Sequence, residues 1–330
     1  MEQIKKEVVV ITGASAGLGR AITVEFARNG ARVACLARGK DRLEETREEI
    51  ENMGGEILTF SVDVSNAEQV DTIASEIEEK WGPIDVWINN AMVGMLSPIK
   101  DMAPEEFKRI MEVNFLGQVY GTQAALKRML PRNKGSIVLV GSALAYRGIP
   151  LQSAYCASKH AIQGFFDSLR AELVHDKSAV KVTMPQLPAM NTPQFDWMRN
   201  KMPNKPKPMG TVYQPEIAAR AIYYSAYHDI REFKVTGSSL FLILANQLMP
   251  GILDKYLGKK AYKGQQSSQK AEQRADNLFE PVEGSYGAHG RFDQKAKSSS
   301  KQVFLRENIN VAAAVVTGIV VAGVLIKKWP

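Results

Sequence analysis

The chain has 330 residues, 45% of them hydrophobic, which is enough apolar material for one large domain and excludes a disordered protein. Residues 1–254 hold 29 basic and 29 acidic side chains, so the whole net charge of +7 lies in residues 255–330. A neutral body lacks the positive surface that nucleic acid requires, and a basic tail favours anionic membrane surfaces. The two cysteines and four histidines show neither a disulfide framework nor metal-ligand spacing, so we expect no metal site.

The first 237 residues alternate short β-branched runs with amphipathic segments of helical length. Strands that are apolar on both faces and separated by helices belong to a parallel sheet covered by helices on both sides. The sequence therefore predicts an α/β fold, a single doubly wound parallel-sheet domain over residues 1–257, with ligands at the carboxyl ends of the strands. The predicted strands are 7–12, 31–37, 56–62, 84–90, 135–142, 180–186 and 232–237.

Residues 258–307 are predicted to be an extension made of a linker and a latch. The stretch before it, 238–257, is apolar but interrupted by polar residues, a proline and a glycine, so we expect a broken amphipathic helix rather than a membrane span. From 258 to 277 the composition turns to Gln, Ser, Lys and Gly, which is typical of a linker. Phe279, Tyr286 and Phe292 then follow in "LFEPVEGSYGAHGRFD", which we interpret as a latch lying on the body.

A candidate membrane anchor occupies residues 308–328. Only Thr317 interrupts the apolar run 311–326, and with residues 309 and 310 the run reaches about 27 Å of helix at ~1.5 Å per residue. That length barely spans a bilayer core, but two lysines and a tryptophan follow it and suit the interface. We therefore expect a transmembrane helix that holds the body at the cytoplasmic face of a membrane. The alternative is a helix packed on the body or in an oligomer of a cytoplasmic protein.

A glycine-rich turn, "TGASAGLGR" at residues 12–20, joins the first predicted strand to a helix. Gly13, Gly17 and Gly19 let the backbone approach a pyrophosphate closely, and the N–H groups at the start of the helix favour phosphates. Glycines also serve simply to turn or cap a chain, so the turn alone is a weak indication of a nucleotide site.

Six motifs occur in the order and at the spacing of one known family. They are "TGASAGLG", "DVS" at 63–65, "NNA" at 89–91, Asn114, Ser142 and Y-x-x-x-K at 155–159. Over residues 5–237 the chain resembles the short-chain dehydrogenase/reductase family. The resemblance implies a nicotinamide-dependent oxidoreductase on one Rossmann-type sheet, and homodimers or homotetramers formed through the long helices after the fourth and fifth strands.

Tyr155 and Lys159 stand one helical turn apart. A phenol with a pKa of ~10 is a poor acid at neutral pH, so an enzyme that uses one needs positive charge beside it, which Lys159 supplies. Packing alone would be the favoured explanation of an isolated pair of this kind. By resemblance, Tyr155 exchanges a proton with the substrate oxygen and Ser142 hydrogen-bonds that oxygen. Lys159 would hold the nicotinamide ribose and lower the tyrosine pKa, and Asn114 would hold a water that links Lys159 to solvent.

The resemblance also implies a set of cofactor contacts, in which residues 63–64 meet the adenine and residues 90–91 line the ribose side. At the end of the second strand a carboxylate would bind the ribose 2′-OH of NAD. Arg38 stands there instead, so we expect NADP, with NAD possible. The full predicted set is Gly13, Ser15, Gly17, Leu18, Gly19, Arg38, Asp63, Val64, Asn90, Ala91, Tyr155, Lys159 and Pro185.

Two stretches depart from the family pattern. Met92 and Val93 precede Gly94 after "NNA", where the family usually continues directly with glycine. In the sixth strand, where the family commonly has Pro-Gly, Gln186 replaces the glycine, and the loop to Thr192 is longer than usual. We therefore expect the surroundings of the nicotinamide to be shaped differently, and the contacts to its carboxamide stay open.

The substrate is indicated by residues 188–210, where family members place a mobile lid. Soft and aromatic side chains there favour an apolar or lipid-like ketone or alcohol, and a loop packed on its own body is an equal alternative. The leading hypothesis is an NADP(H)-dependent oxidoreductase that interconverts a ketone and a secondary alcohol. The alternatives are NAD-dependent alcohol oxidation and a cofactor-binding scaffold without turnover. The lid side chains in question are Met190, Phe195, Trp197, Met198 and Met202.

Overall fold

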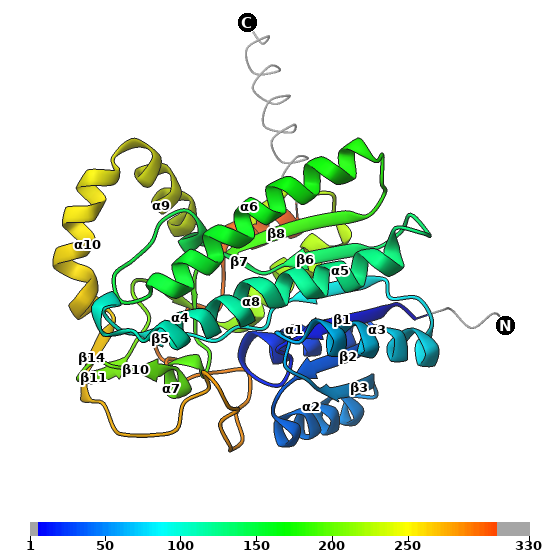
Figure 1. The fold of residues 1–330 in the computed structure, drawn as a ribbon, viewed down its shortest axis with the longest axis horizontal. Helices are drawn as coiled ribbons and strands as arrows, with labels where there is room; N and C mark the ends of the chain where they lie inside the picture. The colour runs from blue at the N-terminus through cyan, green and yellow to red at the C-terminus, as the bar shows by residue number, and fades with distance from the viewer. Residues whose placement is uncertain (1–5, 309–330) are drawn as a thin grey trace, which may run out of the picture.

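The structure of the protein, a computed structural model, describes residues 6–308 (Figure 1). A parallel sheet runs through the described part, with the strand order β13-β8-β6-β4-β1-β2-β3 and the short β7 paired to β8. The predicted α/β doubly wound sheet is confirmed. Its strands are β1 (Val8–Thr12), β2 (Arg32–Ala37), β3 (Glu56–Ser61), β4 (Val86–Asn89), β6 (Ser136–Leu139), β7 (Gly141–Ser142), β8 (Lys181–Leu187) and β13 (Glu232–Lys234).

The central strand β1 shows why these strands are apolar at every position. Successive side chains of a strand point to opposite faces of the sheet. Val8 and Val10 therefore pack in the core on one face, while Val9 and Ile11 pack in the core on the other face. All four side chains are fully buried, so the run "VVVI" is required by burial on both sides.

Helices cover both faces of the sheet in the described part of the chain (Figure 1). One layer contains α1 (Gly17–Arg28), α2 (Lys40–Asn52) and α8 (Pro215–Tyr227). The opposite layer contains α3 (Ala67–Trp81), α5 (Gly117–Met129) and α6 (Ser153–His175). Chain order in the sheet reverses between β1 and β4, so the carboxyl ends of these two strands mark the place where such sheets bind ligands.

Short elements lie beyond the carboxyl edge of the sheet. A helix, α4 (Pro104–Met111), leads through a π-helical turn at Glu112–Leu116 into α5. The remaining short elements are β5 (Met95–Leu96), β9 (Ala189–Met190), α7 (Gln194–Trp197), β10 (Arg199–Asn200), β11 (Asn204–Pro206) and β12 (Val212–Tyr213).

The chain beyond β13 contains more regular structure than its composition predicts. The expected broken helix is present as α9 (Gly237–Leu248) and α10 (Pro250–Gly264). The predicted linker at 258–277 is wrong over its first half, because α10 continues to Gly264 and β14 (Gln266–Lys270) pairs with β11. Leu257 and Ala261, one helical turn apart, are buried, so tertiary packing maintains the helix where the exposed residues suggest a linker.

After β14 the chain returns across the carboxyl edge of the sheet, as the orange trace in Figure 1 shows. Near Lys297 it pairs with Tyr213 of β12, and α11 (Lys301–Glu307) follows. We call residues 277–293 the strap. It contains the three aromatic residues of the predicted latch.

No helix within residues 6–308 is both long and apolar enough to cross a bilayer. Of the predicted anchor at 308–328, only Asn308 belongs to the described residues, and the rest of that prediction lies outside them.

Candidate active site

The glycine turn connects β1 to α1 at the carboxyl edge of the sheet. Gly13 has φ of +67°, a conformation that a side chain disfavours, and its N–H donates to Leu36 O at 2.7 Å. A β-carbon at Gly19 would lie 2.0 Å from Gly13 O, so only glycine permits this closure of the turn. The turn therefore has the shape that the sequence predicts for close approach to a phosphate group.

Asn90, after β4, ties the ends of the two central strands together. Its amide Nδ2 donates to Thr12 O at 2.9 Å and to Gly13 O at 3.3 Å, and its N–H donates to Thr12 Oγ1 at 2.9 Å. Ala91 lies against the turn, because a β-carbon at Gly13 would stand 2.7 Å from Ala91 Cα. The predicted residues Gly13, Asn90 and Ala91 are therefore one contiguous group.

Ser142, Tyr155 and Lys159 come together where β7 meets α6. The Lys159 ammonium donates to Val140 O at 2.7 Å, just before β7, and lies 5.7 Å from the centre of the Tyr155 ring. The Ser142 hydroxyl interacts with the Tyr155 phenol and accepts the N–H of Leu144 at 3.1 Å. The structure therefore places a hydroxyl, a phenol and an ammonium side by side.

Asn114 lies behind this group, in the π-helical turn between α4 and α5. Its Oδ1 accepts the N–H of Val93 at 2.8 Å and its Nδ2 donates to Val93 O at 2.9 Å. A longer contact of 3.4 Å joins Nδ2 to the Ser158 hydroxyl of α6. Asn114 thus fixes the loop after "NNA" to the helix that carries Tyr155 and Lys159. Single π-helical turns of this kind are frequent at functional sites.

Burial changes the acid–base properties of the two residues on α6. It raises the pKa of Tyr155 to about 12, and the interaction with Ser142 acts in the opposite direction. It lowers the pKa of Lys159 to about 8. At neutral pH the phenol therefore holds its proton, and the adjacent lysine is close to its titration range.

Asp63 and Val64, after β3, lie beside α4. The carboxylate of Asp63 accepts hydrogen bonds from the Arg109 guanidinium and, at 3.0 and 2.7 Å, from the N–H and hydroxyl of Ser65. Burial favours a higher pKa for Asp63, but these hydrogen bonds outweigh it and hold the pKa below its usual value. Asp63 is therefore a charged group that holds the Arg109 guanidinium beside the end of β3.

The guanidinium of Arg38, predicted to bind a 2′-phosphate, contacts the strap. It donates to Asn277 O at 2.5 Å and to Phe279 O at 2.6 Å. The glycine turn is also engaged by the strap, because the N–H of Gly17 donates to Gly287 O at 2.9 Å. Two of the predicted cofactor contacts are therefore occupied by main-chain carbonyls of this same chain.

The departure at Gln186 changes the course of the sixth predicted strand. β8 continues through Pro185 and Gln186 to Leu187, and Pro185 pairs in register with Phe233. The Gln186 amide is buried and donates to Gln163 Oε1 at 3.2 Å. The loop that follows brings Thr192 against the glycine turn, where a β-carbon at Gly17 would lie 3.2 Å from Thr192 Cβ.

The lid segment packs largely on the body. Phe195 and Met198 are buried in a cluster with Leu96 and Leu151, while Trp197 meets Tyr286 of the strap edge-on at 4.7 Å between ring centres. This is the alternative that the composition of the lid left open.

Sequence reasoning missed residues that the structure places at the cleft. Arg42 of α2 donates to Val282 O and lies over the rings of Trp197 and Tyr286, and Arg109 of α4 donates to Leu278 O at 3.1 Å. Leu278 is fully buried in the cluster that includes Val64. The arginines had no motif to mark them, and Leu278 is one apolar residue in a polar stretch.

The family of the chain follows from comparison with known proteins. A model of the short chain dehydrogenase family matches residues 7–202. The chain is 30% identical to "Uncharacterized oxidoreductase YxnA" of Bacillus subtilis (strain 168) over 324 residues, which is 97% of this chain and 90% of that protein. The protein therefore belongs to the short chain dehydrogenase family and is an oxidoreductase, as its motifs predict.

More distant relatives and solved structures are consistent with that assignment. The chain is 33% identical over 231 residues to the 3-ketodihydrosphingosine reductase of Bos taurus, covering 66% of this chain and 68% of that protein. An alcohol dehydrogenase from the archaeon Thermococcus sibiricus, complexed with 5-hydroxy-NADP, superposes with a TM-score of 0.59 at 28% identity. A metagenomic short-chain oxidoreductase in complex with NADP gives a TM-score of 0.58 at 26% identity. The alignments cover 69% and 68% of this chain, and 95% of each solved chain.

The burial of Lys159 predicts a pH dependence of stability. Its pKa is ~10.4 in an unfolded chain and about 8 in the folded protein, so between these values the unfolded chain binds more protons. The free energy of unfolding therefore rises with pH in this window. From about pH 7.5 to about pH 9.5, wild type should gain about 2 kcal/mol more than Lys159→Met in urea unfolding. Lys108→Met, at an exposed lysine, should show the same dependence of the free energy of unfolding on pH as wild type. If Lys159→Met also shows the wild-type dependence, the lowered pKa of Lys159 is contradicted.

Proposed function

We propose that the protein is an NADP(H)-dependent oxidoreductase that interconverts a ketone and a secondary alcohol. The observation that carries this proposal is the convergence of Ser142, Tyr155 and Lys159 at the carboxyl ends of β6 and β7, with Asn114 behind them. A hydroxyl donor, a protonated phenol and a buried ammonium are the groups needed to move a proton to a carbonyl oxygen.

The residues around the carboxyl edge fit a dinucleotide. The glycine turn has the close approach to Ala91 and the backbone N–H groups that a pyrophosphate requires. Arg38 supplies a bidentate guanidinium at the end of β2, which suits a 2′-phosphate better than a 2′-hydroxyl. Gly13, Gly17, Gly19, Asn90 and Ala91 would therefore hold the pyrophosphate and ribose side. The solved relatives that were complexed with NADP or its 5-hydroxy derivative support the same choice of cofactor.

When bound, NADPH would supply the hydride that the carbonyl carbon takes up in the reductive direction. Ser142 donates a hydrogen bond that orients the carbonyl oxygen, and Tyr155 transfers its phenolic proton to that oxygen, so the product is a secondary alcohol. Lys159 stabilises the phenolate left on Tyr155, because a positive charge lowers the cost of ionising a buried phenol. Asn114 positions Lys159 and Tyr155 by fixing α6 to the loop at Val93. Phenolate reprotonation from solvent completes the cycle.

We propose an apolar or lipid-like substrate. Methionine side chains lie around Gly94 next to the site, since a β-carbon there would stand 3.5 Å from Met198 Cε and 3.7 Å from Met92 Cε. Flexible thioethers suit long apolar groups of varied shape. The similarity to a 3-ketodihydrosphingosine reductase, whose name indicates a lipid-derived ketone, supports the same class. NAD-dependent alcohol oxidation is the runner-up.

Changing Tyr155 to Phe tests the chemistry. The variant should lose at least about 100-fold in kcat with an apolar ketone, since it deletes the proton donor but little of the packing. Its NADPH dissociation constant, measured by fluorescence of the reduced nicotinamide, should stay within about threefold of wild type. Tyr224→Phe, at a tyrosine of α8 that stacks on His228, is the matched control and should keep full turnover. A Tyr155→Phe protein that retains more than a few per cent of the wild-type rate would refute the mechanism.

The cofactor preference is tested at Arg38. Arg38→Asp should lower the ratio of kcat/KM for NADPH to kcat/KM for NADH by at least about tenfold, because it removes a partner of the 2′-phosphate and adds a repulsive carboxylate. Arg38→Met separates the lost attraction from the new repulsion. Both variants also lose the contacts with the strap, but these act on either cofactor and cancel in the ratio. An unchanged ratio would assign the discrimination to another residue.

We also propose that the protein lies on a membrane. α9 carries exposed leucines at three successive turns, Leu240, Leu244 and Leu248, with Phe241 73% exposed beside them. The start of α9 lies next to α11, since a β-carbon at Gly237 would stand 2.9 Å from Gln302. The apolar run 309–326 follows α11 directly in the sequence. Large exposed apolar surface of this kind marks interaction sites, and the basic C-terminal region suits anionic lipids.

Deleting residues 309–330 tests the membrane attachment. The full chain should pellet with membranes in high-speed centrifugation, and the truncated chain should stay in the supernatant with unchanged turnover of a water-soluble ketone. The matched control is the double variant Phe241→Ser, Leu248→Ser. In the full chain, this variant should still pellet with membranes. When residues 309–330 are deleted as well, it should bind anionic vesicles less than the truncated chain that keeps Phe241 and Leu248. A full-length protein that remains in the supernatant without detergent would rule out the anchor.

A further inference from the structure

The strap makes a row of main-chain contacts across the carboxyl edge of the sheet. Three successive carbonyls, those of Asn277, Leu278 and Phe279, accept hydrogen bonds from guanidinium groups on two different elements of the body. Arg38, after β2, holds the first and third at 2.5 and 2.6 Å, and Arg109, on α4, holds the second at 3.1 Å. The strap is therefore fixed by cationic donors through its backbone.

The side chain between these carbonyls is buried. Leu278 is fully buried in a cluster with Val64, after β3, and with Val113, in the π-helical turn. Asn277 and Leu278 are held from the other side by the lid and by Asp276, because their N–H groups donate to Trp197 O and to Asp276 Oδ1, each at 3.0 Å. The leucine thus sits beside Val64, which the proposed function assigns to the adenine.

Farther along, the strap reaches the glycine turn. Gly287 O accepts the N–H of Gly17 at 2.9 Å, and Gly290 N–H donates to Asn191 O at 3.2 Å. Gly290 must be glycine for this approach, since a β-carbon there would lie 2.4 Å from Thr192 O. Ser15, within the turn, is only 7% exposed. A backbone carbonyl therefore occupies a donor of the turn that is proposed to bind the pyrophosphate.

We infer that the strap is an internal competitor of the cofactor. The strap must leave the carboxyl edge of the sheet before NADP(H) binds. This inference rests on the proposed function. A phosphate oxygen is a stronger acceptor for a guanidinium or a backbone N–H than a neutral carbonyl is, because the bond is charge-assisted. The cofactor therefore displaces the strap, but its apparent affinity is reduced by the fraction of molecules in which the strap is closed. The strap is a built-in gate on the dinucleotide site.

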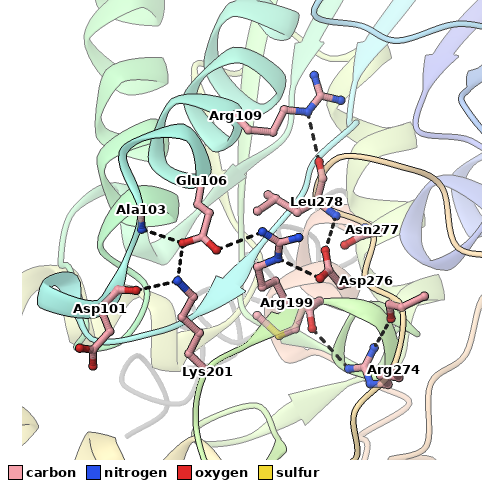
Figure 2. Close-up of polar contacts among 12 residues, drawn as sticks. Asp101, Ala103, Glu106, Arg109, Arg199, Lys201, Arg274, Asp276, Asn277 and Leu278 are labelled. Carbon is pink, nitrogen blue, oxygen red and sulfur yellow. Dashed lines mark hydrogen bonds and ion pairs between the residues drawn. The ribbon is translucent and has the colours of Figure 1, made fainter.

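The gate is coupled to the lid by a chain of ion pairs, shown in Figure 2. Asp276, directly before the strap, accepts a hydrogen bond from Arg199 Nε at 2.8 Å, and Arg199 Nη1 donates to Glu106 at 3.0 Å. Lys201 joins the same carboxylate of Glu106 at 2.7 Å. Glu106, in the first turn of α4, is buried, and its hydrogen bonds outweigh the cost of burial and keep its pKa low. These ion pairs therefore connect the residue before the strap to the lid and to α4.

The test removes the buried side chain of the strap and leaves the cofactor donors intact. Leu278→Ala should lower the NADPH dissociation constant at least about tenfold, because loss of a buried leucine weakens the closed strap by more than that factor. Leu257→Ala, the same change at a buried leucine of α10, is the matched control and should leave the dissociation constant within about twofold. Binding is measured by fluorescence of the reduced nicotinamide.

A second measurement needs no variant. Saturating NADPH should speed hydrogen exchange at the amides of Asn277 and Gly290 in the wild-type chain, whose N–H groups now donate to lid carbonyls. The gate is overturned if wild type binds NADPH and Leu278→Ala binds it with equal or lower affinity. It is also overturned if saturating NADPH slows hydrogen exchange in the strap of wild type. Either result leaves the proposed function standing. Failure of both wild type and Leu278→Ala to bind NADPH or NADH would overturn the proposed function and the gate together.

Discussion

The parallel sheet imposes one constraint on everything around it. All its strands end at the same edge, so the polar groups that follow β1, β2, β3, β4 and β6 gather there, and each buried donor among them requires an acceptor. Some are satisfied within the sheet domain, as Asn90 is by Thr12. Others, Gly17 N–H and the Arg38 guanidinium, are satisfied by the strap. The edge is thus a row of donors whose acceptors are strap carbonyls in this structure and would be phosphates in the proposed function.

The sheet and the proximity of Tyr155 to Lys159 were predictable because their signals are local, whereas Ser142 and Asn114 were expected only from the resemblance to the family. In a strand, side chains alternate between the two faces, so the uninterrupted apolar run "VVVI" predicts burial on both faces. In a helix, residues four apart lie one turn from each other, so the spacing of Tyr155 and Lys159 predicts that they are neighbours. The course of residues 258–293 was not predictable in the same way. α10 continues past 258 because Leu257 and Ala261 are buried by tertiary packing, and the strap binds through carbonyls, which every residue possesses. Contacts of that kind leave no trace in the side-chain pattern.

The lid shows where composition gives half of an answer. Its methionines and aromatics predicted either an apolar substrate or packing on the body; the structure shows the packing, and the substrate class belongs to the proposed function. Phe195 is buried with Leu151, which is packing. Met198 is buried in the same cluster, yet its Cε also faces Gly94 beside the proposed nicotinamide position. The polar residues of the lid carry the further information, because Arg199 connects it to α4 and to the strap.

The coupling of strap and lid sets an order on the reaction. Asn191 anchors the strap twice, through its carbonyl to Gly290 N–H and through Oδ1 to Phe292 N–H at 2.9 Å, and Thr192 beside it touches the glycine turn. Displacing the strap would therefore remove these contacts from the start of the lid, which β12 still holds through Asn191 N–H to Tyr213 O at 2.8 Å. The lid lies next to Gly94, so under the proposed gate the substrate would gain access only after the dinucleotide has displaced the strap. A hydride donor would then be in place before a carbonyl reaches Tyr155.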